Sequence, residues 1–440
     1  MTNRLLRVLG AAFAIAVTFG GTVGPGILRS PGLIAEQLGN YWLILLMWAL
    51  GGVYALFGTM SVAEMAATLP LAGGLYVYPR RAFGGAAGFA IGWSDWIATC
   101  ATVAFIGITV GDFAAEFSPA FAGRQTLIGV LLILLVGLVQ RLGIVVSSRV
   151  QECISVLQAV ALLALIVACF ALGGGAASGD AAGSVPQTPR SPFAWIAAMI
   201  VAFRFIVVDY DGWYTAIYFA EEEREPANLP RAMIQGVVGI IAFYLLLNAA
   251  FLHVLPAGKI AGLKLAASDV ARLVFGERGG KLVTLVALVC TTAVVNAVVL
   301  TLTRTLYGLS RDGLFWRRAE TVNAAGTPTV ALFLSCSASV ALVATGTFEK
   351  LVAIASFLFV VNYSSAVLSL LMLRKREPEL PRPWRVPWYP YVPLAVLSTG
   401  VGFLIADLVT DPGNSLPALG LLACSYPVYL LTRSRPGRSV

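Results

Sequence analysis

Long apolar segments alternate with short polar loops along almost the whole chain. Each apolar segment is close to the roughly 20 residues that an α-helix needs to cross a bilayer. Twelve such segments can be counted, at 8–37, 41–69, 86–117, 125–141, 147–172, 193–222, 230–255, 279–306, 329–346, 350–373, 391–409 and 416–432. The pattern predicts an all-α membrane protein with twelve transmembrane helices, folded as a single transmembrane domain over 1–440.

The first apolar segment is interrupted near its centre by the run FGGTVGPGILRSP at 19–31. Its glycines weaken a helix, and Pro25 removes a backbone donor and clashes with the preceding turn. Backbone groups freed in this way are tolerated in hydrocarbon only where they line a cavity or are buried in protein. We therefore expect a discontinuous helix whose outer half begins near Ile27 and offers its amide N–H groups to a carboxylate. A continuous, kinked helix packed through the GxxxG pair Gly20 and Gly24 is the alternative.

The sixth apolar segment is interrupted as well, within 203–213. This stretch places Arg204, Asp209, Asp211 and Gly212 at membrane depth, where charged side chains are costly and mark functional sites. The second break lies five segments after the first, and five is an odd number. The second half of the chain therefore enters the membrane from the opposite side.

An inverted repeat follows from this arrangement. We expect 1–172 to form the first repeat, 193–373 the inverted second repeat, and 391–432 two additional helices. The two breaks then meet at the membrane midplane. In transporters, paired interruptions of this kind mark the binding site.

Composition supports a polytopic membrane protein and argues against a soluble enzyme. Of the 440 residues, 58% are hydrophobic and 12% are charged, whereas a soluble domain is about 25% charged. The formal charge of +8 does not indicate nucleic-acid binding, because the basic residues fall in loops between apolar segments. They are concentrated in the loops that would be cytoplasmic if the N-terminus is inside, which predicts a cytoplasmic-membrane protein with both termini in the cytoplasm.

Cofactor motifs are missing from the sequence. The six cysteines lie within apolar segments and form no CxxC pair, so we expect neither disulfides nor a metal site. No GxxxxGK[ST] motif occurs, so ATP is not expected to drive a cycle. In the loops, 173–191 is expected to be flexible, and 266–280 reads as an amphipathic helix, either a lid over an external vestibule or a helix with no gating role.

Several motifs resemble those of the amino acid–polyamine–organocation (APC) superfamily. They are GTVGPGIL in the first segment, LAGGLYVYPRRAFG at 71–84, YDGWYTAIYFAEEEREPANLPRA at 210–232, RTLYGLSRDGLFWRRAETVNAAGTP at 304–328 and REPELPRPWRVPWYP at 376–390. The match runs in order along nearly the whole chain and is most similar to bacterial amino acid permeases akin to the L-type exchangers. This resemblance implies the leucine-transporter fold and amino acid transport by alternating access.

The resemblance also implies where the substrate binds. Amide groups of the first break suit the substrate carboxylate, and the carbonyl end of the outer half of the sixth span suits its ammonium group. The candidate substrate-binding residues are Thr22, Gly24, Gly26, Ile27, Val208, Asp209, Asp211, Gly212 and Trp213.

The chain departs from the family pattern at both breaks. Pro25 stands where the family often has serine, which removes one amide donor from the carboxylate site. Asp209 and Asp211 stand where L-type relatives usually have small neutral residues. They could bind an ammonium group, favouring cationic amino acids or polyamines, or one of them could cap the inner half-helix that begins near Gly212.

A third departure concerns coupling. Gln158 ends the stretch RVQECISVLQ, where the family pattern often has lysine; we expect it to tie the fifth span to the first and eighth by hydrogen bonds. Lysine-based proton coupling is then in doubt, and exchange, facilitated flux or coupling through another group such as Asp95 or Glu64 stays open. Arg204 is expected to neutralise Asp209, Asp211 or Asp95, so Gln158, Arg204 and Asp95 form the candidate charge network.

The inner end of the sixth span carries a cluster of glutamates. These are Glu221, Glu222, Glu223 and Glu225, and they are expected to face Arg4, Arg7 and Arg149 as an inner gate. A solvated run of charges is the alternative.

The functional hypothesis is a secondary transporter or exchanger of amino acids, with neutral substrates favoured. Cationic amino acids or polyamines are the alternative substrates. A membrane-embedded enzyme using Asp209 and Asp211, or a sensor that binds amino acids without cycling, would be a different class; an enzyme is disfavoured because no nucleophile–base pair is present. We expect no disulfide-linked heavy subunit, and a homodimer stays open.

Overall fold

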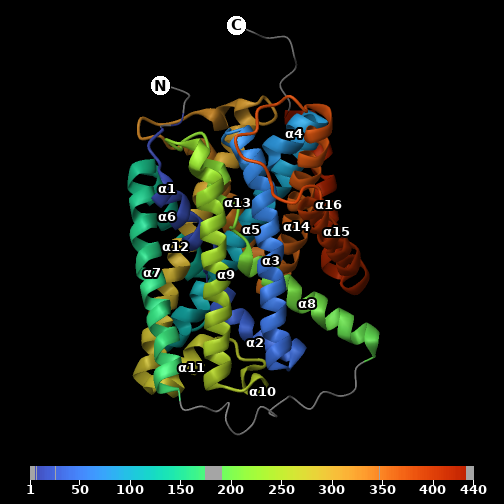
Figure 1. The fold of residues 1–440 in the computed structure, drawn as a ribbon. Helices are drawn as coiled ribbons and strands as arrows, with labels where there is room; N and C mark the ends of the chain where they lie inside the picture. Colours follow the sequence, from blue (N-terminus) through green and yellow to red (C-terminus); the bar gives the residue numbers. More distant parts are fainter. Residues whose placement is uncertain (1–4, 6, 25, 174–190, 346, 433–440) are drawn as a thin grey trace.

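The computed structural model describes residues 5, 7–24, 26–173, 191–345 and 347–432. It forms one helical bundle, with α4 at one end and α10 and α11 at the other (Figure 1). The helices of the first half are α1 (Ala11–Thr22), α2 (Gly26–Leu38), α3 (Tyr41–Thr68), α4 (Val77–Phe83), α5 (Gly85–Phe117), α6 (Gln125–Arg141) and α7 (Ile144–Leu172). Those of the second half are α8 (Pro192–Tyr210), α9 (Leu229–Val254), α10 (Ala257–Ile260), α11 (Ala266–Phe275), α12 (Glu277–Arg311), α13 (Thr329–Thr345), α14 (Phe348–Arg376), α15 (Tyr391–Thr410), α16 (Pro412–Ala423) and α17 (Ser425–Thr432).

Short 3₁₀ segments connect these helices. They are η1 (Gly74–Tyr76), η2 (Pro119–Phe121), η4 (Thr215–Phe219), η5 (Pro226–Asn228) and η6 (Arg317–Glu320). Among the described 3₁₀ segments only η4 lies inside an expected span, after the turn at 211–214 that follows the end of α8. It therefore marks a place where the sixth span is not regular α-helix.

Helices lie at each of the twelve ranges that hydropathy picks out. Among the described residues, nine helical segments are long and apolar enough to cross a membrane. The pair α1 and α2, bent by 41° at its break, makes a tenth if counted as one span. The other two, α6 and α13, are apolar but only 17 residues long. The chain is thus an all-helical, multi-pass membrane protein.

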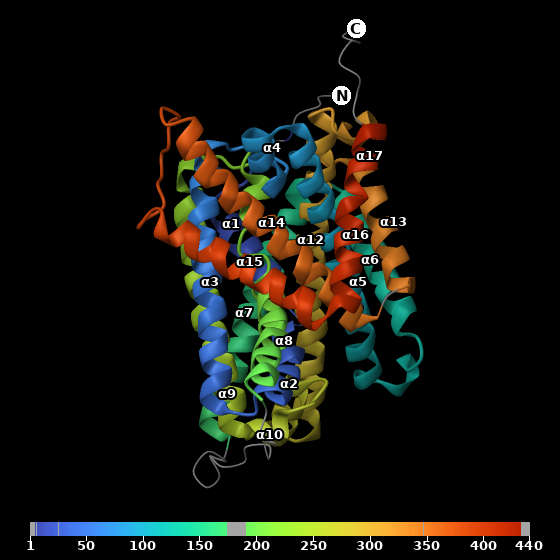
Figure 2. The ribbon, with the colours of Figure 1, turned by 90° about the vertical axis from the view of Figure 1, so that its right-hand side faces the viewer.

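Two helices form the centre of the bundle. In both α5 and α14, 83% of the most apolar window is buried, against 17% across α16 and α17. Small residues allow the close packing: a Cβ on Gly129 of α6 would lie 2.7 Å from the Gly107 carbonyl oxygen of α5, as is typical of interfaces between membrane helices. Figure 2 shows α15, α16 and α17 along the outside of the bundle.

Large apolar side chains cover the outer faces of α6 and α7. Exposed examples are Leu131, Leu134, Leu138, Val156, Val160 and Val167. In water such a surface would be an association site, but in a membrane protein it is the face that contacts lipid tails.

Ion pairs tie the interrupted spans to α12 at the α4 end. Glu222 pairs with Arg304 at 3.1 Å, and both side chains are fully buried. Glu221 pairs with Arg311 at 2.5 Å. The prediction that Arg7 and Arg149 pair with these two glutamates is therefore wrong, because α12 supplies both cations. Arg4, the third predicted partner, lies outside the described residues.

The outer amphipathic segment is helical as expected. It forms α11, where Arg272 pairs with Asp269 at 2.8 Å and approaches Glu116 at 3.4 Å. The expected flexible loop at 173–191 lies almost wholly outside the described residues. Whether α11 acts as a lid stays a prediction.

Loss of the Arg304 charge should destabilise the protein strongly. Arg304→Met leaves the Glu222 carboxylate buried without its cation, which costs about 3–5 kcal/mol for a broken buried pair. The measurement is thermal unfolding in detergent. The double change Arg304→Met with Glu222→Gln should recover most of the loss, and Arg81→Gln, at the exposed pair with Glu377, should have little effect. Equal unfolding temperatures for Arg304→Met and Arg81→Gln would contradict this account.

Candidate functional site

The first span is broken, as the glycine-rich run predicts. Helix α1 ends at Thr22 and α2 begins at Gly26. The carbonyl of Val23, in the break, accepts a hydrogen bond from the Gln158 amide of α7. Gln158 therefore satisfies a backbone group that the break frees, and the discontinuous helix is favoured over a simple kink. Pro25 lies outside the described residues.

The sixth span breaks directly after Tyr210. Asp211 follows the last turn of α8, and Gly212 has φ +106°, a conformation that favours glycine. The chain then continues through turns into η4. The expected capping role of aspartate is wrong: η4 has no side-chain cap, and the Asp211 carboxylate accepts a hydrogen bond from the Tyr363 hydroxyl of α14.

The two breaks touch each other. A Cβ on Gly212 would lie 2.6 Å from Thr22 Oγ1 and 3.1 Å from the Gly21 carbonyl. The Tyr244 hydroxyl of α9 lies 2.7 Å from the Thr22 carbonyl oxygen and 2.8 Å from that of Asp209, and donates to both. One side chain thus satisfies the ends of two interrupted helices, because each carbonyl has lost its partner further along the helix.

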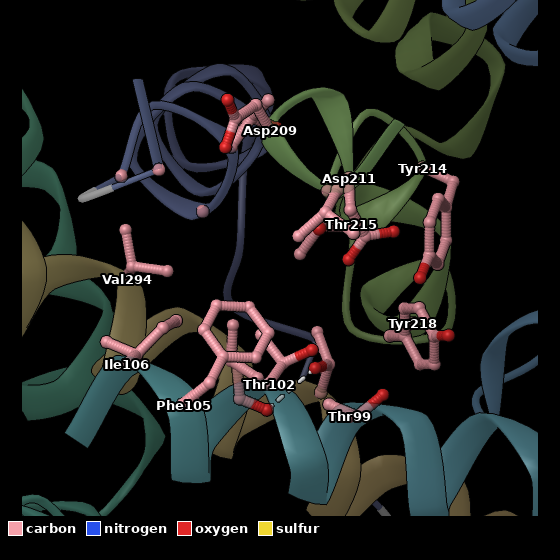
Figure 3. Close-up of a pocket in the computed structure, with 18 residues that line it drawn as sticks. Thr99, Thr102, Phe105, Ile106, Asp209, Asp211, Tyr214, Thr215, Tyr218 and Val294 are labelled. Carbon is pink, nitrogen blue, oxygen red and sulfur yellow. Dashed lines mark hydrogen bonds between the residues drawn. The ribbon is translucent and has the colours of Figure 1, made fainter. Parts of the chain in front are cut away.

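A cavity opens between the breaks and the face of α5. The volume that the centres of water molecules can occupy in it is about 50 Å³, enough for a few waters or a small polar ligand. Figure 3 shows Asp209, Asp211 and Thr215 on one side and the α5 side chains on the other. The lining residues are Gly21, Thr22, Gly24, Gly26, Thr99, Thr102, Phe105, Ile106, Val208, Asp209, Asp211, Gly212, Tyr214, Thr215, Tyr218, Val294, Val298 and Thr301.

Seven of the nine candidate substrate-binding residues line this cavity. They are Thr22, Gly24, Gly26, Val208, Asp209, Asp211 and Gly212. Ile27 is fully buried in the core away from the lining. Trp213 packs against Tyr214 and Tyr363, with ring centroids 4.9 and 5.0 Å away. Their substrate roles stay predictions.

Sequence reasoning missed the contribution of α5. Thr99, Thr102, Phe105 and Ile106 all line the cavity. Thr99, Thr102 and Phe105 follow one another at intervals of three residues and Ile106 is four residues after Thr102, which places all four on one face of a helix. A pair of threonines on one face of an otherwise apolar segment is the signal that would have found them.

The acids in and near the cavity have no cation partner among the described residues; Asp95 lies behind the lining residue Tyr218 and is not itself a lining residue. Asp95 accepts hydrogen bonds from Tyr218 at 2.7 Å and Thr305 at 3.2 Å, and its Oδ1 has no partner among the described residues. The Oδ2 of Asp209 and the Thr22 hydroxyl are also buried without a hydrogen-bond partner there. Unpartnered buried polar atoms in a cavity indicate a ligand or water site.

Arg204 does not neutralise any of the cavity acids, and that prediction is wrong. Its guanidinium pairs with Asp407 of α15 and with Asp411, the latter at 2.8 Å. Ser415 also donates to Asp407 at 2.9 Å. Arg204 therefore joins α8 to the peripheral helices instead of serving the site.

Glu64 is not a free acid for coupling. It pairs with Arg374 at 2.5 Å and with Arg382 at 3.4 Å. Two guanidiniums next to one carboxylate place Glu64 in a structural cluster of ion pairs.

The link between the fifth and eighth spans runs through a different glutamine from the expected one. Asn296 of α12 donates to the Gln151 side chain of α7 at 3.0 Å. Thr291 and Thr292, a hydroxyl pair of the kind that can help to hold sodium, bond the carbonyls of their own helix at 2.5 and 2.9 Å.

Comparison with known proteins identifies the family. The family described as "Amino acid permease" matches residues 9–418. The chain belongs to this amino acid permease family.

Similar permeases include a serine/threonine exchanger, SteT of Bacillus subtilis (strain 168), which is 27% identical over 439 residues and 98% of each chain. The large neutral amino acids transporter small subunit 2 of Rattus norvegicus is 25% identical, covering 97% of this chain and 81% of its own. The Asc-type amino acid transporter 1 of Mus musculus is 25% identical, covering 98% and 83%. This permease therefore transports or exchanges amino acids and is not an enzyme.

Removal of the Tyr244 hydroxyl should loosen the meeting point of the two breaks in this permease. Tyr244→Phe leaves two buried carbonyls without a donor, which costs about 1–3 kcal/mol. We expect a lower unfolding temperature and weaker substrate binding, measured by thermal unfolding with and without substrate. Tyr426→Phe on α17, where the side chain is exposed, is the matched control and should match the wild type. An unchanged Tyr244→Phe variant would contradict the shared hydrogen bond.

Proposed function

We propose that this permease exchanges neutral amino acids across the cytoplasmic membrane by alternating access on the leucine-transporter fold. The single observation that carries the proposal is the contact between the two helix breaks at one cavity. A transporter needs backbone donors and acceptors at membrane depth to bind both ends of a zwitterion. Helix α2 supplies free amides and α8 supplies free carbonyls at that place.

The twelve-span, inverted-repeat topology is part of this proposal. Helix α1 begins toward the α4 end and α2 ends toward the α11 end, whereas α8 and η4 run the opposite way (Figure 1). This antiparallel course of the two broken spans supports repeats at 1–172 and 193–373. The helices α6 and α13 would complete the count, with α15 to α17 outside the repeats.

Orientation and assembly follow from sequence chemistry. The arginine-rich α4 end would face the cytoplasm, with both termini on that side. The chain would act without a disulfide-linked heavy subunit, because no cysteine lies in an outer loop of the sequence. A homodimer stays a hypothesis.

Neutral substrates are favoured by the relatives and by the cavity lining. The serine/threonine exchanger and the large neutral amino acids transporter are named for such substrates. Valine, threonine, isoleucine and phenylalanine side chains line much of the cavity. A small cavity of this character suits a small, uncharged side chain better than a long cationic one.

A cationic amino acid is the second candidate substrate, and one observation favours it. Asp209 and Asp211 both line the cavity, while no Lys, Arg or His does so among the described residues. A screen of ligand-dependent thermal stability across common amino acids and polyamines separates the two candidates.

Gly26 should be essential for transport. A side chain at this position would meet the Asp209 carboxylate, whose Oδ1 lies 1.8 Å from an ideal Cβ, and would fill the end of α2. Gly26→Val should reduce serine or leucine counterflow in proteoliposomes at least tenfold while the protein still folds. Gly239→Val, where a Cβ meets nothing within 4 Å, is the matched control. Undiminished counterflow in Gly26→Val would refute the placement of the site.

A further inference from the structure

The Asp209 carboxylate lies beside the place where a substrate carboxylate is proposed to bind. An ideal Cβ on Gly26 would lie 1.8 Å from its Oδ1, so this oxygen is packed against the first residue of α2. Ser30, one turn further along α2, lines the same small cavity as this carboxylate. Amide N–H groups in the first turn of a helix have no partner within the helix and attract anions. The chain's own side chain therefore competes for that position.

No cation compensates Asp209 within the described part of the chain. Asp209 is only 4% exposed, and its Oδ2 has no hydrogen-bond partner among the described residues. The nearest arginine of α2, Arg29, instead pairs with Asp112 at 2.8 Å and lies 3.8 Å over the Phe348 ring. Arg204, on the same helix as Asp209, is held by α15. A buried, unpaired carboxylate is costly unless it takes up a proton or a cation.

The other ionisable groups around Asp209 do not relieve this cost. Tyr244 of α9 donates its proton to main-chain carbonyls, and Tyr210 of α8 donates to the Trp48 carbonyl at 3.1 Å. Asp211 faces the same cavity and adds negative charge.

Two acids nearby differ from Asp209 in their surroundings. Asp211 has the hydroxyl of Tyr363 as a partner, and Asp95 of α5 has those of Tyr218 and Thr305. Asp209 is thus the acid that combines an unpartnered oxygen with a position at the helix end.

Asp209 also separates two cavities. Besides the central cavity, it lines a smaller one of about 10 Å³, large enough for about one water. Gly26, Val208 and Phe105 line both, and the smaller cavity extends to Phe348 at the start of α14. A carboxyl group between two such spaces can exchange a proton through water on one side and meet the substrate on the other.

We propose that Asp209 carries a proton across the membrane with each amino acid, so that the permease couples amino acid movement to the proton gradient. The proposal rests on the proposed function. Two carboxylates cannot share one helix end while both are ionised, because like charges at contact distance repel strongly. The substrate carboxylate therefore binds when Asp209 has taken a proton from water. The protonated Asp209 then donates that proton as a hydrogen bond, and releases it to water on the other side after the substrate leaves.

The test uses the full-length permease in proteoliposomes with radiolabelled serine. With the outside one pH unit more acidic, a coupling of one proton per amino acid gives up to about tenfold accumulation in the wild type, the equivalent of one pH unit. A pH-sensitive dye inside the vesicles should report proton entry on addition of serine. Counterflow of serine in the same vesicles is measured separately and tests exchange itself.

Asp209→Asn should abolish the accumulation that the pH gradient drives. In each preparation, accumulation is normalised to the counterflow measured in the same vesicles. Asp209→Glu, which keeps a titratable group, should retain part of the accumulation. Asp269→Asn on the surface of α11 is the control for replacing a carboxylate by an amide, and should accumulate serine as the wild type does.

Three results overturn the proposal. Gradient-driven accumulation by Asp209→Asn that matches the wild type, normalised to counterflow, would exclude Asp209 as the carrier. A wild type that shows counterflow but neither accumulation nor proton entry would exclude proton coupling while leaving amino acid exchange intact. If Asp209→Asn does not fold, the dye measurement on the wild type and the Asp209→Glu variant still decides the question. A folded Asp209→Glu variant that shows counterflow but no accumulation would exclude a titratable carrier at this position.

Discussion

The contact between two helix breaks is the constraint on which the rest of the structure depends. A break in a membrane helix frees carbonyl and amide groups, and hydrocarbon offers no water to satisfy them. Here the Tyr244 hydroxyl bonds the carbonyls of both Thr22 and Asp209, and Gln158 bonds that of Val23. The breaks persist because neighbouring helices supply these partners. The Thr22 hydroxyl, which belongs to a residue lining the cavity, has no hydrogen-bond partner among the described residues and is available to a ligand.

The two interrupted spans are joined a second time near the α4 end. The Leu9 amide bonds the Glu222 carbonyl, and the Arg224 amide bonds the Leu9 carbonyl, both at 3.0 Å. The buried pair of Glu222 with Arg304 fixes the same region to α12. A main-chain link and an ion pair therefore hold the two interrupted spans together and fix them to α12 at this end. On the α11 side, Arg29 stacks on Phe348 and pairs with Asp112.

Sequence reasoning predicted the features that depend on local chemistry. Glycine, proline and charged residues inside apolar segments located both breaks, and hydropathy located the helices to within a few residues. The sequence did not reveal which charges meet, because partners such as Arg204 and Asp407 are about two hundred residues apart. Because Arg204 and Asp209 are close along the chain, they were predicted to pair. In the structure Arg204 contacts Asp407 and Asp411, whereas Asp209 lies against Gly26 of α2. The inner half of the sixth span was expected to be helical, and close contact with Thr22 through Gly212 leaves it as turns and 3₁₀ structure instead.

The link between Arg204 and the two aspartates at the end of α15 has a mechanical consequence. The α15–α17 segment is mostly surrounded by lipid, and on hydropathy alone it looks like a passive addition to the bundle. Yet separation of α8 from α15 would strand one positive and two negative charges in a low-dielectric medium. A tilt of α8 during transport would therefore have to carry α15 with it. In such a cycle the peripheral helices belong to the moving part of the permease, and its stationary part lies elsewhere in the bundle.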